Sequence, residues 1–140
     1  MRHYLLALVF AASISTAHAH VRIQPAESRP GAKQTYTVRV PTEGKVATTA
    51  LVLDVPDGVS AVSADGQAEL TKMGEKTLSI TWKAEIPPGQ SQTFTFEATN
   101  PGSGQQIVWK AHQHYADGSS RDWTDAPSSK NPAPVTRLGD

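Results

Sequence analysis

The chain has 140 residues, with 13 Lys and Arg against 13 Asp and Glu, a formal net charge of zero, and no cysteine. This balance argues against nucleic acid or an anionic membrane surface as a partner, because both attract proteins with excess positive charge. Without cysteine there can be no disulfide and no thiolate metal site, so a metal ion would have to be held by nitrogen and oxygen atoms.

Residues 1–19 have the features of a secretory signal peptide. Arg2 and His3 form a short positive region, and an apolar run follows over residues 5–14. That run is shorter than the roughly 20 apolar residues of a membrane-spanning helix. Ala17-His18-Ala19 has the small-x-small form of a cleavage site and predicts cleavage after Ala19. We therefore expect a mature domain of residues 20–140, free in the periplasm and without a membrane span.

The mature region shows no helical periodicity of useful length. Short runs of alternating apolar and polar residues are separated by Pro, Gly and Asp clusters about every ten residues, which is typical of a β-sandwich. These runs occupy residues 21–23, 35–40, 49–55, 59–63, 77–84, 93–98, 106–115 and 120–124, with a weaker run at 68–71. The run at 106–115 is predicted to be the longest strand, with Ile107, Trp109, Ala111 and Tyr115 on one face. The pattern predicts one immunoglobulin/cupredoxin-like antiparallel β-sandwich.

Cleavage after Ala19 would make His20 the first residue of the mature protein. The α-amine and Nδ1 of an N-terminal histidine can chelate one metal ion in a six-membered ring. An α-amine has a reference pKa of about 7.7–8.0, so a metal displaces its proton near neutral pH at little cost. The alternative is that His20 is an arbitrary first residue.

Removal of the signal peptide would leave His112 and His114 as the other histidines. They are two apart on a predicted strand and so share one face, opposite Trp109 and Ala111. We expect both to face solvent, either as a secondary surface metal site or as part of a solvated polar face.

A series of short motifs runs in order through nearly the whole mature chain. It comprises His20-Val21 with Pro25 and Gly31, Val38-Arg39-Val40-Pro41-Thr42-Glu43, Thr48-Thr49, Asp54-Val55-Pro56, Ile80-Thr81-Trp82, Ile86-Pro87-Pro88-Gly89, Phe94-Thr95-Phe96, Trp109-Lys110-Ala111, Gln113, Tyr115, Asp117-Gly118, Trp123 and Pro132-Ala133-Pro134. The ordered set resembles the YcnI-like family of bacterial copper-associated domains. One departure is the absence of the family's Pro-Gly-Trp around residues 64–68.

The resemblance implies a β-sandwich that binds Cu(II) through a single-histidine brace, formed by the amine and Nδ1 of His20. The matching tryptophan is Trp123, which lies near a strand end beside Asp122 and is expected to be half-exposed. The favoured carboxylate is Glu43 of the Val-Pro-x-Glu motif, and Glu27, seven residues after His20, is the alternative.

The leading hypothesis is an exported Cu(II)-binding protein that acts in copper handling as a chaperone, buffer or delivery factor, with other periplasmic copper-handling proteins as partners and no enzymatic activity. An amine, an imidazole and a carboxylate form a nitrogen and oxygen set that suits tetragonal Cu(II).

One alternative is a copper oxygenase of the polysaccharide-cleaving type, which needs a second histidine. A two-histidine carrier of the CopC type would carry Asp-x-His where this chain has His112-Gln113-His114. The last alternative is an adhesion or scaffold sandwich in which His20 is incidental.

Overall fold

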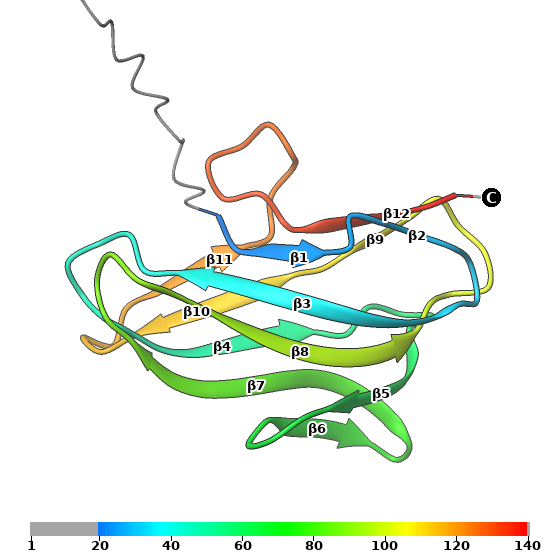
Figure 1. Ribbon diagram of the computed structural model, residues 1–140, viewed down its shortest axis with the longest axis horizontal. Coiled ribbons are helices and arrows are strands. Elements are labelled where there is room, and N and C mark those ends of the chain that lie inside the picture. The colour runs from blue at the N-terminus through cyan, green and yellow to red at the C-terminus, as the bar shows by residue number, and fades with distance from the viewer. Residues whose placement is uncertain (1–19, 140) are drawn as a thin grey trace, which may run out of the picture.

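The computed structural model describes residues 20–139, and the predicted signal peptide lies outside them. Every regular element in the described part is a β-strand, which confirms the all-β prediction (Figure 1). Among the same residues no helix is long and apolar enough to cross a membrane.

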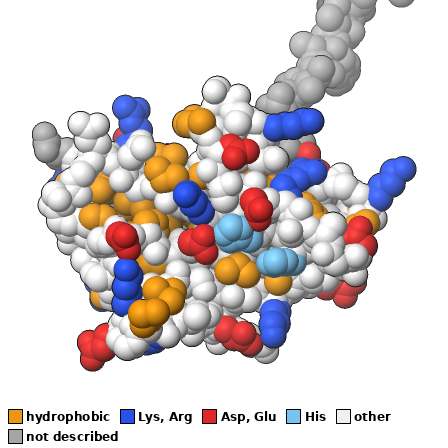
Figure 2. Space-filling model, turned by 180° about the vertical axis from the view of Figure 1, so that it is seen from behind, with side chains coloured by type: hydrophobic (Ala, Val, Ile, Leu, Met, Phe, Trp, Pro, Cys, Tyr) orange, Lys and Arg blue, Asp and Glu red, His pale blue; other side chains and the backbone are white. Residues whose placement is uncertain are grey.

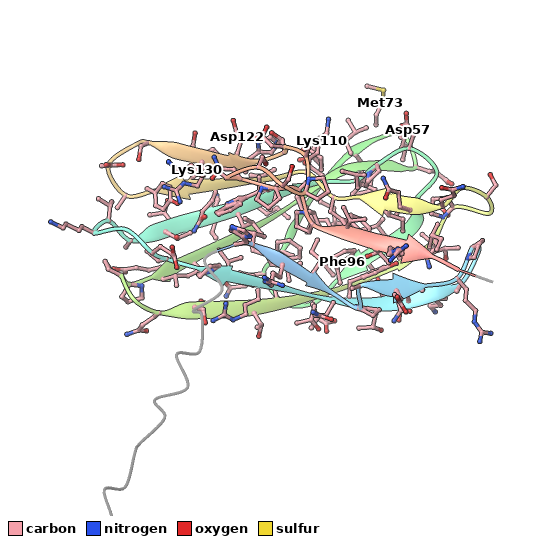
Figure 3. All side chains as sticks on the ribbon, turned by 90° about the horizontal axis from the view of Figure 1, so that it is seen from above. Asp57, Met73, Phe96, Lys110, Asp122 and Lys130 are labelled. Carbon is pink, nitrogen blue, oxygen red and sulfur yellow. The ribbon has the colours of Figure 1, made fainter. Side chains whose placement is uncertain are left out.

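Two main sheets form the two layers of the sandwich, and Figure 3 shows Phe96 between them. The first sheet has the order β1 (Arg22–Gln24), β3 (Lys33–Pro41), β8 (Ser91–Thr99), β5 (Ser60–Ala64). The second has the order β11 (Ser120–Trp123), β10 (Ala111–Tyr115), β4 (Thr48–Asp54), β7 (Lys76–Ile86), β6 (Glu69–Met73). A third, small sheet has the order β2 (Glu27–Ser28), β12 (Val135–Leu138), β9 (Gln106–Val108).

The core follows the predicted alternation of side chains. Tyr36, Val38 and Val40 of β3 are fully buried, and Leu51 and Leu53 of β4 meet them from the other sheet's inner face. Because side chains alternate with a period of two along a strand, the intervening residues turn outward. A cluster of aromatic rings fills the middle of the sandwich, formed by Tyr36, Phe96 and Trp109.

The predicted single strand over residues 106–115 is wrong. The chain makes two strands there, β9 and β10, which pair with β12 and β4 respectively. Between them the amide of Trp109 donates to Pro134 O at 2.8 Å, while Lys110 O accepts from the amide of Asp54 at 2.9 Å. The chain therefore changes partner at Trp109, and β7, with 11 residues, is the longest strand. The register also shifts between His114 and Tyr115, and Tyr115 is only half-buried.

Strand β1 fixes where the described chain begins. Its register pairs Arg22 with Arg39 on β3. Val21 and Ile23 are buried, so the segment is held by packing as well as by the strand ladder. Continued by two residues, the same register brings His20 opposite Pro41, at the end of β3.

Candidate metal centre

The rings of His20 and Trp123 are in contact, with centroids 5.6 Å apart and planes inclined at 55°. His20 precedes β1, an edge strand of the first sheet, and Trp123 ends β11, an edge strand of the second. Their contact therefore bridges the two layers at one edge of the sandwich.

The expectation that Trp123 is half-exposed is wrong, because only 1% of the residue is exposed. Trp123 pairs with Ala111, which is also buried, so its indole points into the sandwich. The charged neighbour Asp122 points the opposite way, since successive side chains on a strand alternate. The indole Nε1 donates to Gln113 Oε1 at 3.0 Å. Trp123 thus meets His20 from the protein interior.

One charged side chain, Arg121, contacts Trp123, and another, Glu43, lies near Tyr115. The Arg121 guanidinium carbon is 5.8 Å from the centroid of the Trp123 ring, a distance typical of a cation–π contact. The pKa of Tyr115 is raised, chiefly by burial; the Arg121 charge lowers it and the Glu43 charge raises it. Glu43 is therefore within electrostatic range of Tyr115, at the end of the sandwich that carries Arg121 and Trp123. Its side chain is exposed in the loop between β3 and β4.

The alternative carboxylate, Glu27, lies in a different part of the fold from His20. It is on β2, in register with Arg137 of β12. It lines a surface hollow with Arg29 and Gln105, whereas His20 lines a different hollow with Pro132 and Pro134. Because β1 runs extended between them, at about 3.3 Å per residue, the chain moves away from His20 before it reaches Glu27.

His112 lies between two carboxylates on the outer face of the second sheet. Its Nδ1 is 2.7 Å from Asp122 Oδ1, and its Nε2 is 2.9 Å from Asp54 Oδ2. Figure 2 shows histidine side chains beside acidic ones on this face, and His114 is exposed. The two acids lie on opposite sides of the imidazole, so both ring nitrogens are occupied. Within residues 20–139 no group of three or more His, Asp or Glu side chains is arranged to hold a metal ion.

The arrangement around His112 predicts that folding stability falls as the pH rises. Burial lowers the pKa of His112, but hydrogen bonds to Asp122 and Asp54 and the charges of both outweigh it, so the net pKa is raised. The added stability is complete below the unfolded pKa of 6.5 and is lost as the pH rises through the higher folded value. Urea unfolding at about pH 6 and about pH 8.5 should show this fall in the wild type and a smaller one in His112→Gln. Equal falls in both proteins would assign the pH dependence to other groups.

Comparisons with known proteins place the chain among relatives. The sequence pattern of a family described as a domain of unknown function, DUF1775, matches residues 64–138. The chain belongs to the DUF1775 family. This is the YcnI-like family that the motifs indicate, so the resemblance is confirmed.

Two relatives of this DUF1775 chain bear on its function and fold. Copper-binding protein CutI of Bacillus subtilis (strain 168) is 37% identical over 129 residues, an alignment that covers 87% of this chain and 63% of CutI. The chain therefore spans less than two thirds of CutI. A solved structure from Nocardia farcinica, of an uncharacterized protein with an immunoglobulin-like fold, superposes with a TM-score of 0.78 at 27% identity, over 87% of this chain and 99% of that one. The predicted immunoglobulin-like sandwich is confirmed.

Gln113 is a residue of this region that the sequence analysis gave no role. It is fully buried, and its side-chain amide contacts the indole of Trp123. The signal for it was present: between the outward-facing His112 and His114, alternation places a polar amide inside the sandwich.

Proposed function

We propose that this chain is exported to the periplasm, is cleaved after Ala19, and binds one Cu(II) ion through the α-amine and Nδ1 of His20. The observation that carries the proposal is the contact between the rings of His20 and Trp123, which holds the imidazole by packing at the predicted start of the mature chain. Since no group of three or more His, Asp or Glu side chains in residues 20–139 is arranged to hold a metal ion, a tight site there needs another donor. The amine freed by cleavage before His20 supplies it. Copper binding by the relative CutI supports the choice of metal.

Glu43 and Trp123 complete the proposed site. A carboxylate would cancel one charge of the Cu(II) centre and fill an equatorial position that water would otherwise take. Glu43 lies in the loop that follows the strand end opposite His20, whereas Glu27 lines a separate hollow. The indole nitrogen of Trp123 can donate a hydrogen bond but cannot bind a metal, and its hydrogen bond goes to Gln113 Oε1. The role of the indole is therefore to place a π face beside the ion, where a cation is favoured by about 0.5–2 kcal/mol.

We infer that the copper ion is cargo and that the protein acts in copper handling, as a chaperone, buffer or delivery factor among other periplasmic copper proteins. A bulky indole beside the metal blocks access to an axial position, which favours a carrier over an oxygenase. An oxygenase-type brace would need a second imidazole near His20. His112 and His114 are on the outer face of β10, opposite to the face that carries Gln113. Both ring nitrogens of His112 are paired with carboxylates.

The test of this function is Cu(II) titration of mature protein that begins at His20, against a competing chelator of known affinity. We expect one tight equivalent in the wild type and its loss in His20→Ala. The matched control is the double substitution His112→Ala and His114→Ala, which removes the other imidazoles of the mature chain. That control should keep the tight site and lose at most a weaker second equivalent. Loss of the tight site in the control, with retention in His20→Ala, would refute the proposal.

Glu43→Gln should weaken Cu(II) binding without unfolding the domain, because it keeps the shape of the side chain and removes its charge. The matched variant is Glu27→Gln, which changes an exposed glutamate on β2 and should leave the affinity unchanged. Competition titration measures both affinities, and circular dichroism checks the fold. If only Glu27→Gln weakens binding, the carboxylate is Glu27 and the His20 brace stands.

A further inference from the structure

Gln113 makes three buried hydrogen bonds with its side-chain amide. Oε1 accepts from Trp123 Nε1 at 3.0 Å, while Nε2 donates to Pro41 O at 2.8 Å and to Thr48 Oγ1 at 2.8 Å. The residue has no exposed surface. One side chain on β10 therefore ties together β11, the end of β3 and the start of β4.

The chemistry of these partners fixes the direction of every bond. An indole nitrogen only donates and a backbone carbonyl only accepts, so the amide of Gln113 has one orientation that satisfies both Trp123 and Pro41. Thr48 Oγ1 accepts from this amide. Thr42 Oγ1 lies 3.0 Å from Ile86 O and donates its proton there, so in the 2.6 Å contact between the two hydroxyls Thr48 is the donor. A directed chain of hydrogen bonds thus runs from the indole to the carbonyl of Ile86.

The oxygen and the nitrogen of the Gln113 amide each hydrogen-bond a group next to the proposed copper site. Its oxygen fixes the plane of the indole that contacts His20. Its nitrogen holds the carbonyl of Pro41, which lies opposite His20 in the continued β1–β3 register and two residues before Glu43. A buried and fully satisfied network of this kind has one low-energy arrangement, so the parts that it joins hold fixed relative positions.

We propose that Gln113 is a positioning residue for the copper site, which holds the Trp123 indole against His20 and anchors the strand end that leads to Glu43. The inference rests on the proposed function for its copper part, and Gln113 itself does not touch the metal. Groups that orient the parts of a metal site through hydrogen bonds influence its affinity for the metal, and because Gln113 acts through Trp123 and Pro41 we expect its effect on affinity to be modest.

The test compares Gln113→Met with Thr136→Val in mature protein that begins at His20. Methionine has similar length and no amide, so the indole of Trp123 loses its acceptor. The indole of Trp109 is also buried, and its Nε1 donates to Thr136 Oγ1 at 3.1 Å. Thr136→Val removes that acceptor. Both variants disturb a buried indole hydrogen bond, but only Gln113→Met does so beside His20.

Two readouts separate positioning from a general loss of stability. In the metal-free protein, the ring current of Trp123 should shift the imidazole proton resonances of His20 in the NMR spectrum, because the two ring centroids are 5.6 Å apart. We expect this shift to collapse in Gln113→Met and to persist in Thr136→Val. With Cu(II) added, we expect Gln113→Met to raise the Kd a few-fold and to alter the electron paramagnetic resonance spectrum, and Thr136→Val to change neither.

Thr48→Val keeps the inference testable if Gln113→Met does not fold, because it removes one acceptor of the Gln113 amide and leaves the bond to Trp123. A smaller change of both readouts in the same direction is expected. Unchanged His20 resonances and unchanged affinity in a folded Gln113→Met or Thr48→Val would overturn the role of Gln113. Absence of tight Cu(II) binding in the wild type would instead overturn the proposed function, while the resonances of His20 would still decide whether Gln113 positions the ring pair.

Discussion

A version of the chain that retains any residue in front of His20 is expected to lose tight Cu(II) binding while it folds normally. A preceding residue turns the α-amine into a peptide amide, and the chelate ring with Nδ1 is lost. Two donors on one residue bind far more tightly than either donor alone, and linked binding groups gain on the order of 10²- to 10⁴-fold. Competition titrations of the mature and extended proteins should show a loss in this range.

Acetylation of the amine of the mature protein is the chemical control for this experiment, since it blocks the donor without lengthening the chain. It should have the same effect as an added residue. Thermal unfolding of all three forms should give similar midpoints, because Val21 and Ile23, which are buried, hold the segment in the sheet. Equal affinities for the mature and extended forms would show that the amine is not a ligand.

Trp123→Phe is expected to have two large effects. The variant leaves Gln113 Oε1 buried without its donor, which should cost about 1–3 kcal/mol of unfolding free energy in urea. It also removes the indole nearest the proposed copper ion, so most of the Cu(II)-induced fluorescence quenching should disappear, while binding weakens only modestly. Fluorescence titration and urea unfolding measure the two effects.

Trp82→Phe and Trp109→Phe are the matched controls for the quenching experiment. Trp109 is fully buried within the cluster of Tyr36 and Phe96, and Trp82 stacks on Phe94. Both controls should keep the quenching by copper. Quenching that survives in Trp123→Phe and disappears in either control would place the metal elsewhere in the sandwich.

The fold could be predicted to the extent that alternation of side chains determines it. Tyr36, Val38 and Val40 alternate with polar residues, so a strand there has only one face that can be buried. The sequence therefore predicts both the strand and these three core residues, which are fully buried. The run from 106 to 115 keeps its alternation while its partner changes from β12 to β4. That change depends on backbone hydrogen bonds at Trp109 and Lys110, and the side-chain pattern carries no trace of it.

The candidate site was predictable where covalent chemistry defines it and less so where packing does. A cleavage motif before His20 is visible in the sequence, as is the motif tryptophan, and the structure brings Trp123 into contact with His20. The burial of Trp123 was misjudged because its sequence neighbour Asp122 is charged, although neighbours on a strand face opposite sides. The burial of Gln113 follows from alternation, but its role could not be predicted, since its partners Pro41 and Thr48 are distant in sequence.

Pulsed electron paramagnetic resonance of Cu(II)-loaded mature protein tests the central claim most directly, because it identifies the nitrogen atoms bound to the metal. One bound imidazole, seen through its remote nitrogen, together with one amine nitrogen is the result that a brace at His20 requires. The amine coupling should vanish on acetylation. Two imidazoles bound to copper, as His112 and His114 would give, or a spectrum that acetylation leaves unchanged, would contradict it.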